Sequence, residues 1–256
     1  MTLCKCCAMV LTTYLVAFGW CLQTPALGGL WKASGTSAKE IPVSFEAEMT
    51  ISGDFLTVKL SNTSPTGTLN PDDTLGSFYF DILRDGTRPT LAYISAAGDV
   101  YLASQQAPDV LQAAGADIQA VDTGDYSWMF KAMDAAQAPG LGFGIGTVGN
   151  SGLAPNNFSG AIVDGIDYSI YTGEITTRNL DGKLLVKDSA TFTFSGLTGF
   201  TEADIQPTVL FGLGTAPDST LPGIQTPVPG ALALVMCALT GIAGWRFTRR
   251  RPGTHV

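Results

Sequence analysis

Residues 41–60 read IPVSFEAEMTISGDFLTVKL, and their pattern decides the fold class. From Val43 to Ile51 every second residue is apolar and the residues between them are polar, which is the period of a half-buried strand. Ser52-Gly53-Asp54 has the composition of a turn, and the alternation resumes from Phe55 to Leu60. The stretch therefore predicts an antiparallel hairpin with one face in a core.

Further segments of strand composition follow along the chain. Residues 90–95 and 99–103 predict a second pair of strands with Ala96-Ala97-Gly98 as its turn, whereas the alanines of 108–118 favour a short helix. About eight to ten short strands separated by turn signals, without a βαβ rhythm, indicate an all-β domain of the β-sandwich or jelly-roll type. The remaining predicted strands are 75–83, 125–132, 168–176, 189–195 and 208–214.

Charge is distributed unevenly along the 256 residues. The whole chain carries 22 acidic and 14 basic residues, a formal charge of −8. All 22 acids but only nine bases lie in residues 27–226, which therefore carry −13. Such a region is unsuited to nucleic acid, because phosphate binding requires clustered Lys and Arg. The single His, His255, lies outside it, which excludes a His-dependent triad or a His-ligated zinc site there.

The N-terminal segment has the features of a secretory signal peptide. Lys5 precedes an apolar run from Ala8 to Leu22, and small residues follow around Ala26. We therefore expect a signal helix over residues 1–26 that signal peptidase removes. Four of the five cysteines lie in this segment and the fifth is Cys237, so the region between holds no disulfide, thiolate metal site or Cys nucleophile.

The C-terminal segment predicts a single transmembrane helix. Uncharged residues run from Gly230 to Trp245, directly after Pro227-Val228-Pro229. Two prolines keep the preceding segment extended. A cluster of basic residues at the far end would remain in the cytoplasm by the positive-inside rule, which places the rest of the chain outside. These membrane-stop residues are Arg246, Arg249, Arg250 and Arg251.

The order of these features resembles the PEP-CTERM sorting domain of exported Gram-negative proteins. The similarity covers residues 227–251, with Val228 where the family usually has Glu. It implies recognition by an exosortase, cleavage near Pro227, Val228, Pro229 and Gly230, and delivery to the cell surface or exopolysaccharide matrix. Residues 56–64, 70–75 and 78–82 more weakly resemble ectodomain segments of the same proteins, which implies no catalytic residues.

These observations divide the chain into six parts. The central part is the predicted β-domain, and the short segments on its two sides are predicted to be loose connections without a place in the core. The parts are a signal peptide (1–26), a lead-in (27–40), the β-domain (41–214), a linker (215–226), the sorting segment with its transmembrane helix (227–251) and a tail (252–256).

Three groups of residues are candidates for ligand chemistry. Trp128 lies among alternating aromatic residues that form either a core face or a sugar-stacking face. Asp164 and Asp167 make either a turn or a calcium site. Asp72-Asp73 is a paired carboxylate of the kind that glycosidases use, although such residues also make turns. No cofactor is expected apart from calcium.

The function hypothesis is a non-enzymatic, exported, exosortase-processed surface or extracellular-matrix protein, such as a biofilm component. Its β-domain would have a structural or adhesive role. The first alternative is a carbohydrate-binding module of the exopolysaccharide matrix, and the second is a secreted carboxylate-based hydrolase.

Overall fold

The structure, a computed structural model, describes residues 28–105, 108–118, 128–133, 141–147, 166–175, 177–214 and 219–226. These residues belong to one compact unit. Within them the regular elements are twelve strands and three single-turn 3-10 helices, so the all-β prediction is confirmed. The predicted signal helix and transmembrane helix lie outside the described residues, and no helix within them is long and apolar enough to cross a membrane.

The strands vary from two to twelve residues in length. Their bounds are β1 Gly29–Thr36, β2 Pro42–Ser52, β3 Phe55–Asn62, β4 Leu75–Phe80, β5 Ala92–Leu102, β6 Val110–Asp117, β7 Met129–Ala132, β8 Phe143–Gly146, β9 Ile170–Tyr171, β10 Leu184–Ser195, β11 Val209–Leu213 and β12 Thr220–Thr226; the 3-10 helices are η1 Pro71–Asp73, η2 Arg178–Leu180 and η3 Glu202–Asp204.

The predicted hairpin is formed by β2 and β3. Pairing runs in register from Phe45 opposite Asn62 to Ser52 opposite Phe55. Gly53 closes the turn with a φ of 61°, in the left-handed region that glycine tolerates best. The alternate apolar residues of both strands are buried, and their polar neighbours face outward. Local alternation therefore predicted both the pairing and the faces correctly.

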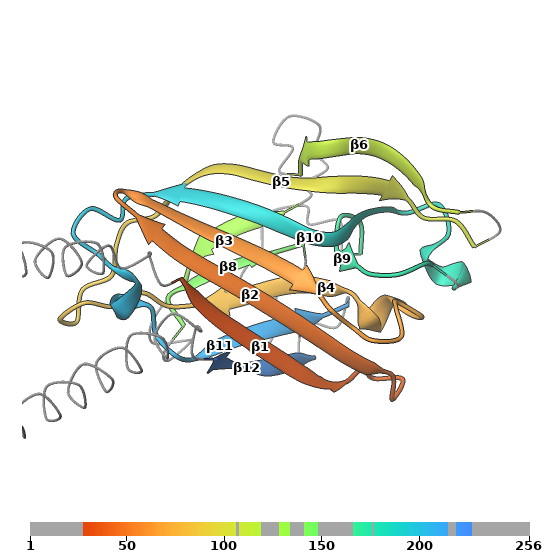
Figure 1. Ribbon diagram of the computed structural model, residues 1–256, viewed down its shortest axis with the longest axis horizontal. Coiled ribbons are helices and arrows are strands. Elements are labelled where there is room, and N and C mark those ends of the chain that lie inside the picture. Colours follow the sequence, from red (N-terminus) through yellow and green to blue (C-terminus); the bar gives the residue numbers. More distant parts are fainter. Residues whose placement is uncertain are drawn as a thin grey trace, which may run out of the picture. The chain divides into compact units, whose positions relative to one another are not determined.

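All twelve strands belong to a single sheet (Figure 1). Its order is β6-β5-β10-β3-β2-β1-β12-β11-β4-β8-β7, and β9 lies off this path. Neighbours are antiparallel, except that β9 pairs in parallel with β10 while it also pairs with β4. The expected β-sandwich or jelly-roll has two packed sheets, whereas hydrogen bonds connect the described strands in one.

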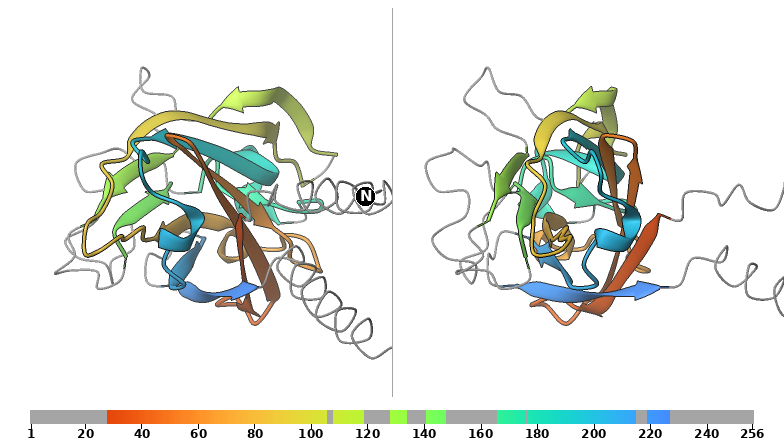
Figure 2. Two further views of the ribbon diagram at one scale, coloured as in Figure 1. Left: turned by 60° about the vertical axis from the view of Figure 1, so that its left-hand side comes forward. Right: turned by 90° about the vertical axis from the view of Figure 1, so that its left-hand side faces the viewer.

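The sheet rolls around a common core (Figure 2). Phe130 of β7, at one end of the strand order, packs on Phe194 of β10 with ring centroids 4.7 Å apart. In the same core, Phe45 of β2 stacks on Phe211 of β11, with ring centroids 6.1 Å apart. Aromatic pairs of this kind add to the hydrophobic gain from burial. Side chains thus join faces of the rolled sheet that backbone pairing does not join directly.

The predicted lead-in and linker are wrong, because residues of both segments form strands of the sheet. Trp31 and Ala33 of β1 are buried and alternate with exposed Lys32 and Ser34. In the other segment, β12 fills the position between β1 and β11. Backbone pairing with the neighbouring strands β2 and β11, and of β1 with β12, orders both segments.

Residues 90–95 and 99–103 were correctly predicted as extended, but the turn predicted between them and the helix predicted over 108–118 are wrong. Ala96-Ala97-Gly98 is not a turn but the middle of β5, where a Cβ on Gly98 would lie 2.6 Å from Cγ1 of Val186. Glycine is therefore needed there for the close approach of β10. The alanine-rich segment forms β6 along β5, and the Asp99 carboxylate accepts the Gly115 N–H at 2.7 Å. Sheet pairing overrides the helix propensity of alanine.

Candidate functional site

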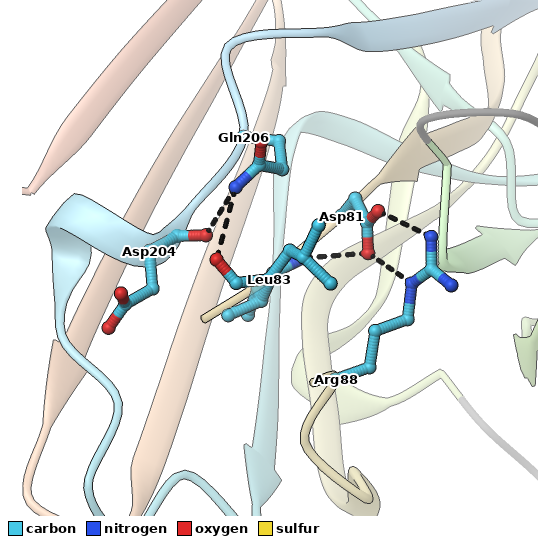
Figure 3. A network of polar contacts seen from close by, with 6 residues as sticks. Asp81, Leu83, Arg88, Asp204 and Gln206 are labelled. Atoms are coloured by element: carbon cyan, nitrogen blue, oxygen red, sulfur yellow. Dashed lines mark hydrogen bonds and ion pairs between the residues drawn. The ribbon is translucent and has the colours of Figure 1, made fainter. Parts of the chain in front are cut away.

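The most buried ion pair of the described domain lies just after β4 (Figure 3). Arg88 donates from Nε and Nη2 to the two carboxylate oxygens of Asp81, both at 2.8 Å. The Asp81 side chain is 1% exposed, whereas that of Arg88 is 28% exposed. The hydrogen bonds to the Asp81 carboxylate raise the pKa of Arg88 above its ordinary value.

Backbone groups complete this network and show what it holds together. The Ile82 N–H donates to Asp81 Oδ1, and the Asp81 carbonyl accepts the Gln206 N–H, each at 2.9 Å. The Gln206 amide donates to the carbonyls of Leu83 and Asp204, as Figure 3 shows. A buried pair with this many partners fixes the loop after β4 to the loop after η3. Its role is therefore structural.

A second polar cluster joins β3, η1 and β9. The Asn62 side chain is buried, and its amide donates to the carbonyls of Asp73 and Ile170 at 3.0 and 3.1 Å. Its oxygen accepts the Ser64 hydroxyl at 2.7 Å. The buried Asp73 carboxylate accepts the N–H groups of Leu69 and Asn70 through Oδ2. Asp73 thus closes its own turn and does not face a second catalytic acid in these contacts.

Tyr171 of β9 is buried at a third polar contact. Its hydroxyl donates to Asp109 Oδ2 at 2.9 Å, and Lys187 lies over its ring at 5.6 Å. Burial raises the pKa of Tyr171, and the hydrogen bond and charge of Asp109 raise it further. The phenol therefore remains a hydrogen-bond donor that ties β9 to the loop before β6.

The candidate calcium ligands are placed only in part. Asp167 Oδ2 forms an ion pair with Lys183 Nζ at 2.9 Å, and Oδ1 accepts the Leu184 N–H at 3.2 Å. Asp164 lies outside the described residues. In the part of the chain that the structure describes, no group of three or more His, Cys, Asp or Glu side chains is arranged to hold a metal ion. The Asp167 contacts join the turn at residues 166–168 to the start of β10.

Trp128 belongs to the core and not to an exposed aromatic row. It is 1% exposed, its ring packs on Phe192 at 5.0 Å, and its indole N–H donates to the Tyr168 carbonyl at 2.8 Å. Sugar stacking requires a free ring face, which this side chain does not offer. Burial therefore argues against the candidate carbohydrate contact at Trp128, because sheet rolling buries a side chain whose alternation is compatible with either face.

The two ends of the described domain lie side by side. Leu30 of β1 is paired with Thr226 of β12, and the Thr226 hydroxyl donates to the Leu30 carbonyl at 3.1 Å. The sheet begins at Gly29, three residues after Ala26, and ends at Thr226, one residue before Pro227. The sorting residues themselves, Pro227–Gly230 and Arg246–Arg251, lie outside the described residues.

No family model, curated protein or solved structure matches this chain. Sequence reasoning missed the Asp81–Arg88 pair and the role of Asn62. A signal for the pair was present, because Asp81 directly follows the fully buried strand Leu75–Phe80 and a buried acid requires a partner. No comparable signal identified Asn62, since Asn next to Thr and Ser commonly makes a turn.

Proposed function

We propose that the chain is an exported surface or extracellular-matrix protein, processed at both ends, with a non-catalytic structural or adhesive β-domain. The observation that best supports it is the agreement between the boundaries of the fold and the processing points proposed from the sequence. Removal of residues 1–26 would leave β1 complete, and cleavage within Pro227–Pro229 would leave β12 complete. Neither step would remove a strand that the structure describes.

Two further observations agree with this role. The region between the proposed processing points carries −13, which favours solubility and contact with acidic polysaccharide through bridging cations. Several described carboxylates also accept hydrogen bonds within the fold: Asp54 accepts the Thr198 hydroxyl, and Asp204 accepts the Thr201 hydroxyl. Neither alternative, the carbohydrate-binding module or the hydrolase, is favoured by a specific contact in the described domain.

Mass spectrometry of the mature extracellular protein tests the proposal. We expect an N-terminus near Ala26 and a C-terminus near Pro229. Replacing Arg246, Arg249, Arg250 and Arg251 with alanine should leave an unprocessed precursor, whereas Lys183→Ala, in the domain, should be processed normally. A mature extracellular form that retains the arginine cluster would refute the sorting proposal.

A further inference from the structure

We propose that β12 controls access to the C-terminal processing segment, and that its last three residues must detach from β1 before cleavage. This inference rests on the proposed function, because it assumes that the chain is cut within Pro227–Pro229. The expected linker before that segment is replaced by a strand that ends at Thr226. The residues directly before the proposed cut are therefore paired within the folded sheet.

The pairing of β12 is staggered between its two neighbours. Its first half, Thr220–Gly223, pairs with β11, and its second half, Ile224–Thr226, pairs with Leu30–Lys32 of β1. The second half can therefore separate from β1 while the first half keeps its partners on β11. The opening is confined to three register pairs and the hydrogen bond from the Thr226 hydroxyl.

Few buried side chains hold Ile224–Thr226 against β1. Every side chain of β12 is exposed or half-buried, and Ile224 is 73% exposed. Leu221 is the β12 side chain that packs against the main core, and it lies in the half that would remain in place. Local opening is least costly where few apolar contacts are lost. The end of β12 is thus held by backbone pairing to β1 alone, with weak side-chain anchoring.

Cleavage requires the backbone next to the cut to be free of its pairing with β1. A protease binds its substrate in an extended form and engages the backbone groups around the scissile bond, much as an added strand does. Because a protease cleft encloses its substrate strand, Ile224–Thr226 cannot enter it while they are held on β1, and cutting depends on the population of the opened form. Pairing with β1 would therefore delay cleavage until Ile224–Thr226 separate from it.

A cross-strand disulfide tests this inference in the full-length precursor. Lys32 and Ile224 are directly opposed and both exposed, and opposed residues of antiparallel strands have Cα separations suited to a disulfide. Lys32→Cys with Ile224→Cys would lock the end of β12. The matched control, Glu48→Cys with Lys59→Cys, locks opposed positions of β2 and β3 instead. The same pairs changed to Ser cannot cross-link.

Conversion of precursor to mature protein is followed by mass in a Gram-negative host that contains the exosortase. We expect the β1–β12 lock to slow conversion about tenfold or more, and the β2–β3 lock and both Ser variants to leave it unchanged. A flexible insert of about six Gly and Ser residues between Thr226 and Pro227 should restore conversion of the locked chain.

Two results would overturn the inference while the proposed function stands. One is a cross-linked β1–β12 chain that is processed as fast as its Ser counterpart. The other is a locked chain that stays unprocessed despite the insert, because pairing would then not be what limits access. If no chain is processed, including the unlocked chain with the insert, the proposed function itself fails.

Discussion

Leu30 and Thr226 lie opposite each other on antiparallel strands, although 196 residues separate them in the chain. Their pairing brings the first and last strands of the described domain together inside the sheet, not at a free edge. Because β12 also pairs with β11, it connects the part of the sheet around β1–β3 to the part around β4. The last strand therefore makes one of two backbone connections between these parts, and β9, which pairs with both β10 and β4, makes the other.

The Asp81–Arg88 pair should be important for stability. Replacing Arg88 with Met leaves the buried Asp81 carboxylate without its cation, so we expect a loss of about 3 kcal/mol in the free energy of unfolding. Urea denaturation of the mature domain measures it. The exposed Lys32–Glu46 pair is the control, and Glu46→Gln should cost less than about 1 kcal/mol. Equal losses in the two variants would contradict the structural role given to the buried pair.

Gly98 should be required by the close approach of β10. A methyl group in Gly98→Ala would press on Cγ1 of Val186, and we expect destabilisation of about 1–3 kcal/mol. Val186→Ala removes the opposing atom, so the double variant should lose clearly less stability than the sum of the single variants. Ala97→Ser, at the exposed neighbouring position, is the control and should be nearly neutral. Additive losses would show that the two positions do not interfere.

The buried phenol of Tyr171 should make the domain sensitive to alkaline pH. Its pKa is raised in the folded state, whereas the unfolded chain ionises near pH ~10. The resulting stability is complete below about pH 10 and is lost as the pH rises toward the folded pKa. Urea unfolding between about pH 9 and pH 11 should show a steeper loss in the native sequence than in Tyr171→Phe.

Tyr93 contributes in the same direction, because burial and the charge of Asp117 also raise its pKa. The double variant with Tyr93→Phe should therefore have the flattest profile of the series. A native profile as flat as that of the double variant would contradict the burial of both phenols.

Trp128 should affect stability and not sugar binding. Trp128→Ala removes a ring that packs on Phe192 and should destabilise the domain by about 3–5 kcal/mol. Trp128→Phe keeps most of the volume and should remain folded. Any polysaccharide retention by the native protein should persist in Trp128→Phe, measured by co-sedimentation with exopolysaccharide. Selective loss of retention in this folded variant would support the carbohydrate-binding alternative instead.

The candidate site was less predictable than the fold class. Alternation around Trp128 indicated that neighbouring aromatics share a face, but whether this face is covered depends on β10, which lies more than 50 residues further along the chain. In the same way, Asp167 could be identified as a carboxylate near a turn, while its ion pair with Lys183 required the two loops to meet. The residue types suggested which ligands Trp128 and Asp167 could bind. Side chains from other segments decided which contacts the two residues make in the fold.

The sequence alone determined the all-β class, the β2–β3 hairpin with its turn, and the acidic, cysteine-free character of the region between its ends. These properties depend on composition or on residues a few positions apart, where a period of two already defines the faces of a strand. Only the tertiary structure decided that β1 and β12 complete the sheet, that β6 is a strand, and that Trp128 is buried. Pairing with β5 orders β6, pairing with each other and with their chain neighbours orders β1 and β12, and Phe192 of β10 packs on Trp128. Local composition does not specify these partners, although backbone groups inside a fold require them.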